Sequence, residues 1–381
     1  MNKLTSPDMM KLKNIKSILK VIHEDNGIYR KKIAEKINLS SQTVTNIVKE
    51  LLDKGIIKEE SVRQMGQGRN PMSLRINYTD FYVIGVEVTV TEIKVVLTNL
   101  LGDLIKACQK QLAEDDDALN VIKQLIDEVK ADFSGINRIQ AVAISVTGVV
   151  NEKKGIIIEV KPLNWFNINL KKELEYLGIP ILIRNDVNTI AHSENFNLRE
   201  DTNFIVVKLD QGIGSSIVID GHVMRSTNSV AGEFGHITVN YAPEVRKCKC
   251  GKYGCLTTLA SIGALEERLD MNYERIKEEV KKGNTEVTRM IEEVSDIVAP
   301  PLANVVILLD LDRIVLTGKF INDFRDIVFE KLSKKIRENL TDWVAYKDLN
   351  IHENVNLAIL SAKLLIDHYF ENEEDLLFQI D

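Results

Sequence analysis

One short stretch, from Ala231 to Cys255, limits the possible folds of this chain more than any other. It reads AGEFGHITVNYAPEVRKCKCGKYGC and contributes one imidazole and three thiols, from His236, Cys248, Cys250 and Cys255. Three thiolates and one imidazole form a complete tetrahedral set for Zn²⁺ and leave no position open for water. The lysines and glycines around them are typical of a polar turn. The stretch therefore predicts one structural zinc ion per chain, with a set of small buried cysteines as the alternative.

The composition is that of an ordinary globular protein with two or three domains. The chain has 381 residues, of which 44% are hydrophobic and 28% charged. Its N-terminus has no apolar signal core, and the longest nearly apolar run, Ile297 to Leu309, is short for a bilayer and contains two prolines. Zinc-type use of three cysteines fits a reducing compartment. We expect a cytoplasmic protein with no membrane partner.

Charge is distributed unevenly along the chain. Residues 1–80 hold 15 Lys and Arg against 9 Asp and Glu, a net charge of +6, whereas the remainder holds 34 against 47, a net charge of −13. A basic head on an acidic body indicates that only the head meets a polyanion.

The basic head, residues 1–78, has the pattern of a winged helix-turn-helix. Helical periodicity is present around 15–22, 30–37 and 41–54, and two short alternating strands, 56–59 and 73–76, flank a Gly-rich loop. The third helix is expected to bury Val44, Val48 and Leu51 and to present its polar face to the major groove of double-stranded DNA. The alternative is a small interaction module with a solvated polar face.

The expected DNA contacts lie on this third helix and on the wing. Small and amide side chains suit base edges and phosphates, and an arginine between Gly and Pro suits a narrow minor groove. The predicted contact residues are Ser40, Ser41, Gln42, Thr43, Thr45, Asn46 and Lys49 on the helix and Arg69 on the wing.

From Phe81 onward the pattern changes to strands that alternate with helices. Strands are predicted at 82–88, 93–97, 139–145 and 204–208, and a helix at 109–132. Similar strand pairs begin the two halves of the body. The residues alone support an α/β body, residues 79–381, with two lobes.

The metal-ligand stretch also resembles the signature of the ROK family, through Gly-Glu-Phe-Gly-His at 232–236 followed by C-x-C-G-x-x-G-C. This family groups bacterial sugar kinases with sugar-responsive transcriptional repressors. The resemblance implies a duplicated actin-like body of the sugar-kinase/ribonuclease H-like type, with ligand between the halves and a zinc loop at 236–255. It also implies that Glu233 and His236 contact the sugar, and that His236 holds the zinc as well.

A second stretch, Asn185-Asp186-Val187-Asn188, resembles the family's Asn-Asp-x-Asn. In the kinases the aspartate is the general base, and without a phosphoryl donor Asp186 can still accept hydrogen bonds from hydroxyls. A strand-end turn is the alternative interpretation. Gly148 and Asn164 lie where family members line the sugar site. The chain departs from the family at Thr257, where a glutamate is usual, so the sugar is not identified.

The nucleotide loops of the family are largely missing. The first phosphate loop, Asp-x-Gly-Gly-Thr in the kinases, is Glu87-Val88-Thr89-Val90-Thr91 here, and the adenosine loop at 314–319 keeps one glycine. Phosphate loops need glycines so that backbone N–H groups can close around the anion. Only Gln211-Gly212-Ile213-Gly214 keeps its glycines. We therefore expect no enzyme activity, with Asp186 as a remnant of the kinase base.

The resemblance covers nearly the whole chain and favours the repressor branch, of the xylose-repressor and N-acetylglucosamine-repressor type. We expect a homo-oligomer, a dimer or tetramer, whose heads bind a pseudo-palindromic operator with an affinity set by a monosaccharide. An active ATP-dependent sugar kinase with a DNA-binding head is one alternative. A DNA-binding protein whose sugar pocket has decayed is another.

Overall fold

The computed structural model describes residues 6–61, 72–113, 115–131, 133–135, 138–198, 202–224, 226–227, 230–242, 245–342, 344, 348–351 and 356–371. The chain forms two compact units. The first unit comprises Met1–Ile144, Lys171–Leu182 and Ser361–Asp381, and the second comprises Ser145–Leu170 and Ile183–Leu360.

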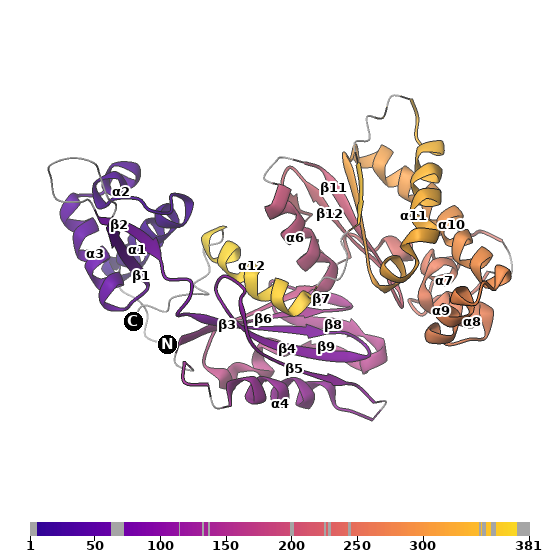
Figure 1. Cartoon of the computed structure of the whole chain (residues 1–381), viewed down its shortest axis with the longest axis horizontal. Coiled ribbons are helices and arrows are strands. Elements are labelled where there is room, and N and C mark those ends of the chain that lie inside the picture. Colours follow the sequence, from indigo (N-terminus) through magenta and orange to yellow (C-terminus); the bar gives the residue numbers. More distant parts are fainter. Residues whose placement is uncertain are drawn as a thin grey trace. The chain divides into compact units, whose positions relative to one another are not determined.

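The first unit begins with the winged helix-turn-helix (Figure 1). Its elements are α1 (Ser6–Glu24), α2 (Arg30–Ile37), α3 (Ser41–Asp53), β1 (Ile57–Ser61) and β2 (Met72–Ile76), and the two strands pair in antiparallel fashion. Asn38 ends α2 in the left-handed region at φ 58°, and the Ser40 side chain caps α3 by accepting from the Thr43 N–H at 3.1 Å. Ile18, Val44 and Val48 are fully buried in the core between the helices.

A five-stranded sheet follows in the same unit, in the order β10-β6-β3-β4-β5. Its strands are β3 (Tyr82–Val88), β4 (Glu92–Asn99), β5 (Leu104–Gln111), β6 (Ile139–Val146) and β10 (Ile181–Asn185). Helix α4 (Ala118–Lys130) covers β4 and β5 (Figure 1), and α5 (Leu170–Glu173) precedes β10. The helix expected from Gln109 is wrong at its start, because Gln109–Gln111 belong to the edge strand β5 and α4 begins after its cap, Asp117.

The second unit contains a second five-stranded sheet, in the order β13-β12-β11-β14-β15. Its strands are β11 (Phe204–Leu209), β12 (Ile213–Ile219), β13 (His222–Val223), β14 (Arg313–Thr317) and β15 (Asp348–Ile351). Strand β11 pairs antiparallel with β12 and parallel with β14. A small antiparallel sheet consists of β7 (Val149–Asn151), β8 (Ile156–Val160) and β9 (Trp165–Asn169). Both large sheets thus contain an antiparallel hairpin, β3–β4 and β11–β12, as expected for two related halves.

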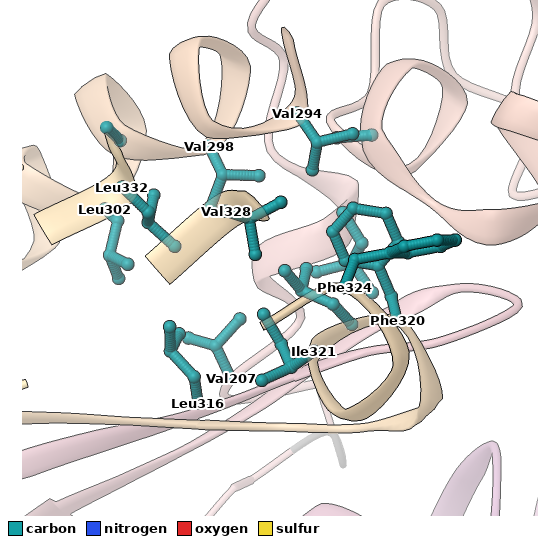
Figure 2. Packing of buried hydrophobic residues seen from close by; sticks show 14 of the residues in the cluster. Val207, Val294, Val298, Leu302, Leu316, Phe320, Ile321, Phe324, Val328 and Leu332 are labelled. Atoms are coloured by element: carbon teal, nitrogen blue, oxygen red, sulfur yellow. The ribbon is translucent and has the colours of Figure 1, made fainter. Parts of the chain in front are cut away.

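The second unit also contains the helices α6 (Asp186–Leu198), α7 (Thr257–Ala260), α8 (Ile262–Leu269), α9 (Tyr273–Lys281), α10 (Thr285–Leu309) and α11 (Lys319–Glu338). The last helix, α12 (Leu357–Glu371), belongs to the first unit from Ser361 onward. Figure 2 shows Val298 and Leu302 of α10 facing Val328 and Leu332 of α11, above Leu316 of β14. All these side chains are at most 1% exposed, so hydrophobic burial holds α10 and α11 against β14. Among the described residues, no helix, α10 included, is long and apolar enough to cross a membrane.

Candidate functional site

The predicted metal ligands come together in the second unit. One ligand atom from each of His236, Cys248, Cys250 and Cys255 lies within 4.8 Å of all the others. The His236 Nδ1 is 3.5 Å from the Cys248 Sγ, and the Cys250 and Cys255 Sγ atoms are 3.7 Å apart. Short backbone bridges, Thr238 with Cys255 and Lys247 with Tyr253, fold the loop onto itself. The structure thus brings into one cluster side chains that lie up to 19 residues apart in sequence.

The thiols and the imidazole of this cluster influence one another's protonation. Burial, followed by the neighbouring thiols, raises the pKa of Cys255 to about 12, whereas the pKa of Cys250 is lowered, against the effect of burial, by a backbone hydrogen bond at Lys252 and by the other two thiols. Burial, Lys252 and Lys161 lower the pKa of His236 and keep the imidazole neutral, which is the form that binds metals. The donor set and its spacing fit tetrahedral zinc.

A second cluster forms where β10 ends and α6 begins. Asp186 is only 3% exposed, and its Oδ2 accepts hydrogen bonds from the Thr147 Oγ1 and from the Lys208 Nζ, both at 2.8 Å. Its Oδ1 accepts from the Val187 N–H at 2.9 Å. Sequence reasoning missed Thr147 and Lys208. A lysine inside the otherwise apolar strand FIVVKL was a signal that could have identified Lys208.

Asn185 positions Asp186 through the backbone. Its Oδ1 accepts from the N–H groups of Val187 and Asn188 at the start of α6, and its Nδ2 donates to the Gly148 carbonyl at 2.9 Å. Gly148 has a φ of 120°, and a Cβ there would be 2.6 Å from the Glu159 carbonyl oxygen. Both residues therefore shape the turn beside Asp186.

Glu233 lies between the Asp186 cluster and the metal ligands. Burial, and secondly the charge of Asp186, raises the pKa of Glu233. Its Oε2 is 3.9 Å from the His236 Nε2, so the imidazole turns one nitrogen toward a thiol and the other toward a carboxylate. Asn164 is exposed, and its backbone has the left-handed conformation with a φ of 53°. It follows Lys161, whose Nζ donates to the Lys249 carbonyl of the metal loop.

Protein side chains accept hydrogen bonds from backbone N–H groups at the first phosphate loop and near the start of α11. In the first unit, the Thr89 Oγ1 accepts from the N–H groups of Glu92 at 2.9 Å and of Thr91 at 3.3 Å. In the second unit, the Asp210 carboxylate accepts from the N–H groups of Gln211 at 2.8 Å and of Lys319 at 3.4 Å. A protein carboxylate thus lies at the N-terminus of α11, a position that attracts anions.

The predicted DNA-contacting residues that the structure describes lie on α3 and at its cap. Ser41, Gln42, Thr45, Asn46 and Lys49 are exposed on α3, and Thr43 is half-buried beside the capping residue Ser40. The Gln42 Nε2 donates to the Asn46 Oδ1 at 2.9 Å, which orders two amide side chains on the surface of the helix. Arg69 lies outside the described residues.

Comparison with protein families gives two matches that together span most of the chain. The family described as "ROK family" matches residues 83–359, and "Winged helix-turn-helix DNA-binding" matches residues 12–58. Among curated relatives, a xylose repressor of Caldicellulosiruptor bescii is 27% identical over 347 residues, which cover 84% of this chain and 86% of that protein. The DNA-binding transcriptional dual regulator NagC of Escherichia coli is 26% identical over 336 residues, 82% of each chain.

Solved structures show the same architecture. A ROK family transcriptional regulator, a homologue of the E. coli MLC protein, has a TM-score of 0.78 at 24% identity and covers 95% of this chain and 97% of its own. A ROK family glucokinase from Streptomyces griseus, in complex with glucose and AMPPNP, has a TM-score of 0.63 at 21% identity and covers 74% and 98%. These likenesses confirm the predicted fold, a winged helix-turn-helix followed by an actin-like sugar-kinase body. The chain therefore belongs to the ROK family, with a winged helix-turn-helix DNA-binding domain ahead of its ROK domain.

Proposed function

We propose that the protein is a sugar-responsive transcriptional repressor that binds operator DNA through residues 1–78 and a monosaccharide through residues 79–381. One observation carries the proposal: an assembled winged helix precedes a sugar-kinase-like body in which the Thr89 hydroxyl accepts two N–H groups of the first phosphate loop. The printed names of the relatives, a xylose repressor and NagC, agree with this function.

The same observation argues against the kinase alternative. A phosphoryl-transfer site needs backbone N–H groups that point at the phosphates. In this protein the Thr89 hydroxyl accepts the N–H groups of Thr91 and Glu92 in the first phosphate loop. The Asp210 carboxylate, which accepts the Lys319 N–H at the start of α11, would also repel a triphosphate. We infer that ATP binding has been lost and that Asp186 no longer acts as a base. A coupled ADP-release assay with D-xylose, D-glucose and N-acetyl-D-glucosamine should show no turnover, and turnover with any of them would overturn this inference.

The sugar, in this proposal, binds at the cluster around Asp186, which we call the effector site. Its residues are Gly148, Asn164, Asn185, Asp186, Glu233 and His236. Asp186 and Glu233 offer carboxylate oxygens to hydroxyl groups, while Asn185 and Gly148 hold the turn that positions Asp186. A sugar alters DNA binding only if it has different affinities for the operator-binding conformation and for a second conformation.

We further propose that His236, Cys248, Cys250 and Cys255 hold one Zn²⁺ per chain. With four protein ligands the ion would bind no water and would act structurally, linking the metal loop to His236 and hence to Glu233. Metal analysis of the freshly purified protein should find about one zinc per chain. Cys255→Ser, which removes a buried ligand, should lose the metal, whereas Cys108→Ser, outside the cluster, should keep it. A full zinc content in Cys255→Ser would contradict the assignment.

The decisive experiment for the repressor function measures binding of the full chain, which we expect to be a homo-oligomer, to a labelled fragment of its own upstream DNA. Salt concentration is fixed, and D-xylose, D-glucose and N-acetyl-D-glucosamine are added separately. Specific binding that one sugar weakens or strengthens supports the proposal. Specific binding that is unchanged at every sugar concentration would instead favour a ligand-independent DNA-binding protein.

A further inference from the structure

Lys208 is an unusual residue for its position. It lies on the central strand β11, where Val206 and Val207 are fully buried and Leu209 is 1% exposed. The Lys208 side chain itself is only 13% exposed, and its Nζ lies 2.8 Å from the Asp186 Oδ2 and 3.9 Å from the Asp210 Oδ2. Removing an ammonium from water is costly unless it is paired, and hydrophobic residues fill such positions at lower cost. The strand therefore carries a buried cation beside the effector site that packing alone does not require.

The pairing determines what Asp186 can do. The Asp186 Oδ2 accepts two hydrogen bonds, from the Thr147 hydroxyl and the Lys208 ammonium, and Oδ1 accepts one, from the Val187 N–H. Each carboxylate oxygen has two lone pairs, so an acceptor position remains on Oδ1. Asp186 can thus accept a further hydrogen bond on Oδ1 while it keeps its ion pair with Lys208.

We propose that Lys208 is a specificity-determining residue of the effector site, which together with Asp186 binds two adjacent hydroxyl groups of an uncharged monosaccharide. One hydroxyl donates to Asp186, and the oxygen of its neighbour accepts from the Lys208 ammonium. The Lys208 side chain keeps 13% of its surface exposed, so the ammonium that pairs with Asp186 is not wholly enclosed by protein. This inference rests on the proposed sugar binding and adds a ligand-contacting residue to it.

The test compares sugar affinity in matched variants of the full chain. Isothermal titration with D-xylose, D-glucose and N-acetyl-D-glucosamine first identifies the sugar that wild type binds most tightly. Lys208→Met removes the ammonium, and Lys331→Met removes an ion-paired lysine of α11, 2.9 Å from Asp296, as the control. A charge-assisted hydrogen bond predicts that Lys208→Met loses about 10- to 100-fold in affinity, while Lys331→Met is unchanged.

Monodeoxy analogues of the same sugar identify the contact. The analogue that lacks the oxygen bound by Lys208 should bind wild type about 10-fold more weakly than the parent sugar, and should bind Lys208→Met as well as the parent does. Since Lys208→Met leaves Asp186 buried without its cation, the double variant Asp186→Asn, Lys208→Met serves as a second test. It should recover the thermal stability of wild type without recovering its sugar affinity.

The outcomes separate this inference from the proposed function. If wild type and Lys208→Met bind the sugar equally, Lys208 has no role in recognition and the inference is wrong, although sugar binding itself stands. If every monodeoxy analogue loses the same affinity in wild type and in Lys208→Met, Lys208 does not contact the sugar directly. If wild type binds none of the three sugars, the result counts against sugar binding as proposed, and the inference falls with it.

Discussion

At the residue scale, Gly148 shows how closely the turn beside Asp186 is packed. Its φ of 120° is strained for any residue with a Cβ, and an added methyl would meet the Glu159 carbonyl oxygen at 2.6 Å. We expect Gly148→Ala to lower the free energy of unfolding by about 3 kcal/mol and to weaken sugar binding, because strain and a backbone clash combine. Gly178→Ala is the control, since Gly178 also has a positive φ, 67°, but nothing within 4 Å of its Cβ. Urea denaturation should show that variant losing only about 1–2 kcal/mol. An equal loss of unfolding free energy in Gly148→Ala and Gly178→Ala would contradict a clash with the Glu159 carbonyl oxygen.

The sequence predicted single residues well where chemistry or spacing is unusual. Three cysteines and a histidine are rare enough together to predict a cluster, and the structure brings these four side chains within metal-binding distance of one another. Thr147 could not be predicted, because a threonine after a buried strand has many possible partners. Lys208 could not be paired with Asp186 either, because 22 residues separate them and the packing of α6 against β11 brings them together. A contact between a helix and a strand leaves no local pattern in the sequence.

At the element scale, the segment Asn77–Asp80 connects the head to the first sheet through specific bonds. Asn77 donates to the Gly55 carbonyl of the head, and the Leu100 N–H donates to the Tyr78 carbonyl. The Tyr78 hydroxyl lies 2.6 Å from the His23 Nδ1 at the end of α1. Residues of the head and of the first sheet, such as Ile22 and Val83, share one hydrophobic core. The head is therefore packed against the sheet of its own unit and not tethered by a bare linker.

This junction predicts a pH dependence of stability. Burial lowers the pKa of His23, with Glu24 opposing, so the folded state takes up a proton less readily than the unfolded state. The stabilisation is present above the unfolded pKa of about 6.5 and is lost as pH falls below it. The melting temperature of wild type should fall more between about pH 7.5 and pH 5.5 than that of His23→Gln. His222→Gln, at an exposed position, should behave like wild type. Parallel pH profiles for wild type and His23→Gln would contradict this assignment.

Elements were predictable where local patterns are strong. The second and third helices of the head follow helical periodicity with an Asn turn and a Ser cap, and their observed limits differ little from those expected. The first helix is longer than the periodicity around 15–22 indicated, because it begins at Ser6. The start of the helix expected at 109–132 was wrong because β5 is an edge strand with mostly exposed residues on both faces. Its polar residues carry no period-two burial signal, so a polar strand and the turn of a helix look alike in sequence.

At the scale of the whole molecule, the charge distribution separates the DNA-binding surface from the rest. Residues 1–80 carry +6 and the remainder −13, and Lys49 is exposed on α3 within the basic part. Each phosphate contact releases counterions, so affinity for DNA should fall steeply with salt. We expect the acidic body to repel DNA, so that the contact is confined to the head and each cation of the head contributes to affinity.

Two variants on α3 separate the electrostatic from the base-reading part of this surface. Lys49→Ala should weaken binding to operator and to random DNA alike and reduce the slope of log affinity against log salt by about 1. Gln42→Ala should cost about 1–3 kcal/mol on the operator only and leave the slope unchanged, because an amide reads bases without neutralising a phosphate. Lys334→Ala, an equally simple loss of an exposed lysine in the body, should change neither. DNA titrations at several salt concentrations measure the affinity and the salt slope of all three variants. A salt slope that changes in Lys334→Ala and not in Lys49→Ala would place DNA on the body and would refute binding by the head alone.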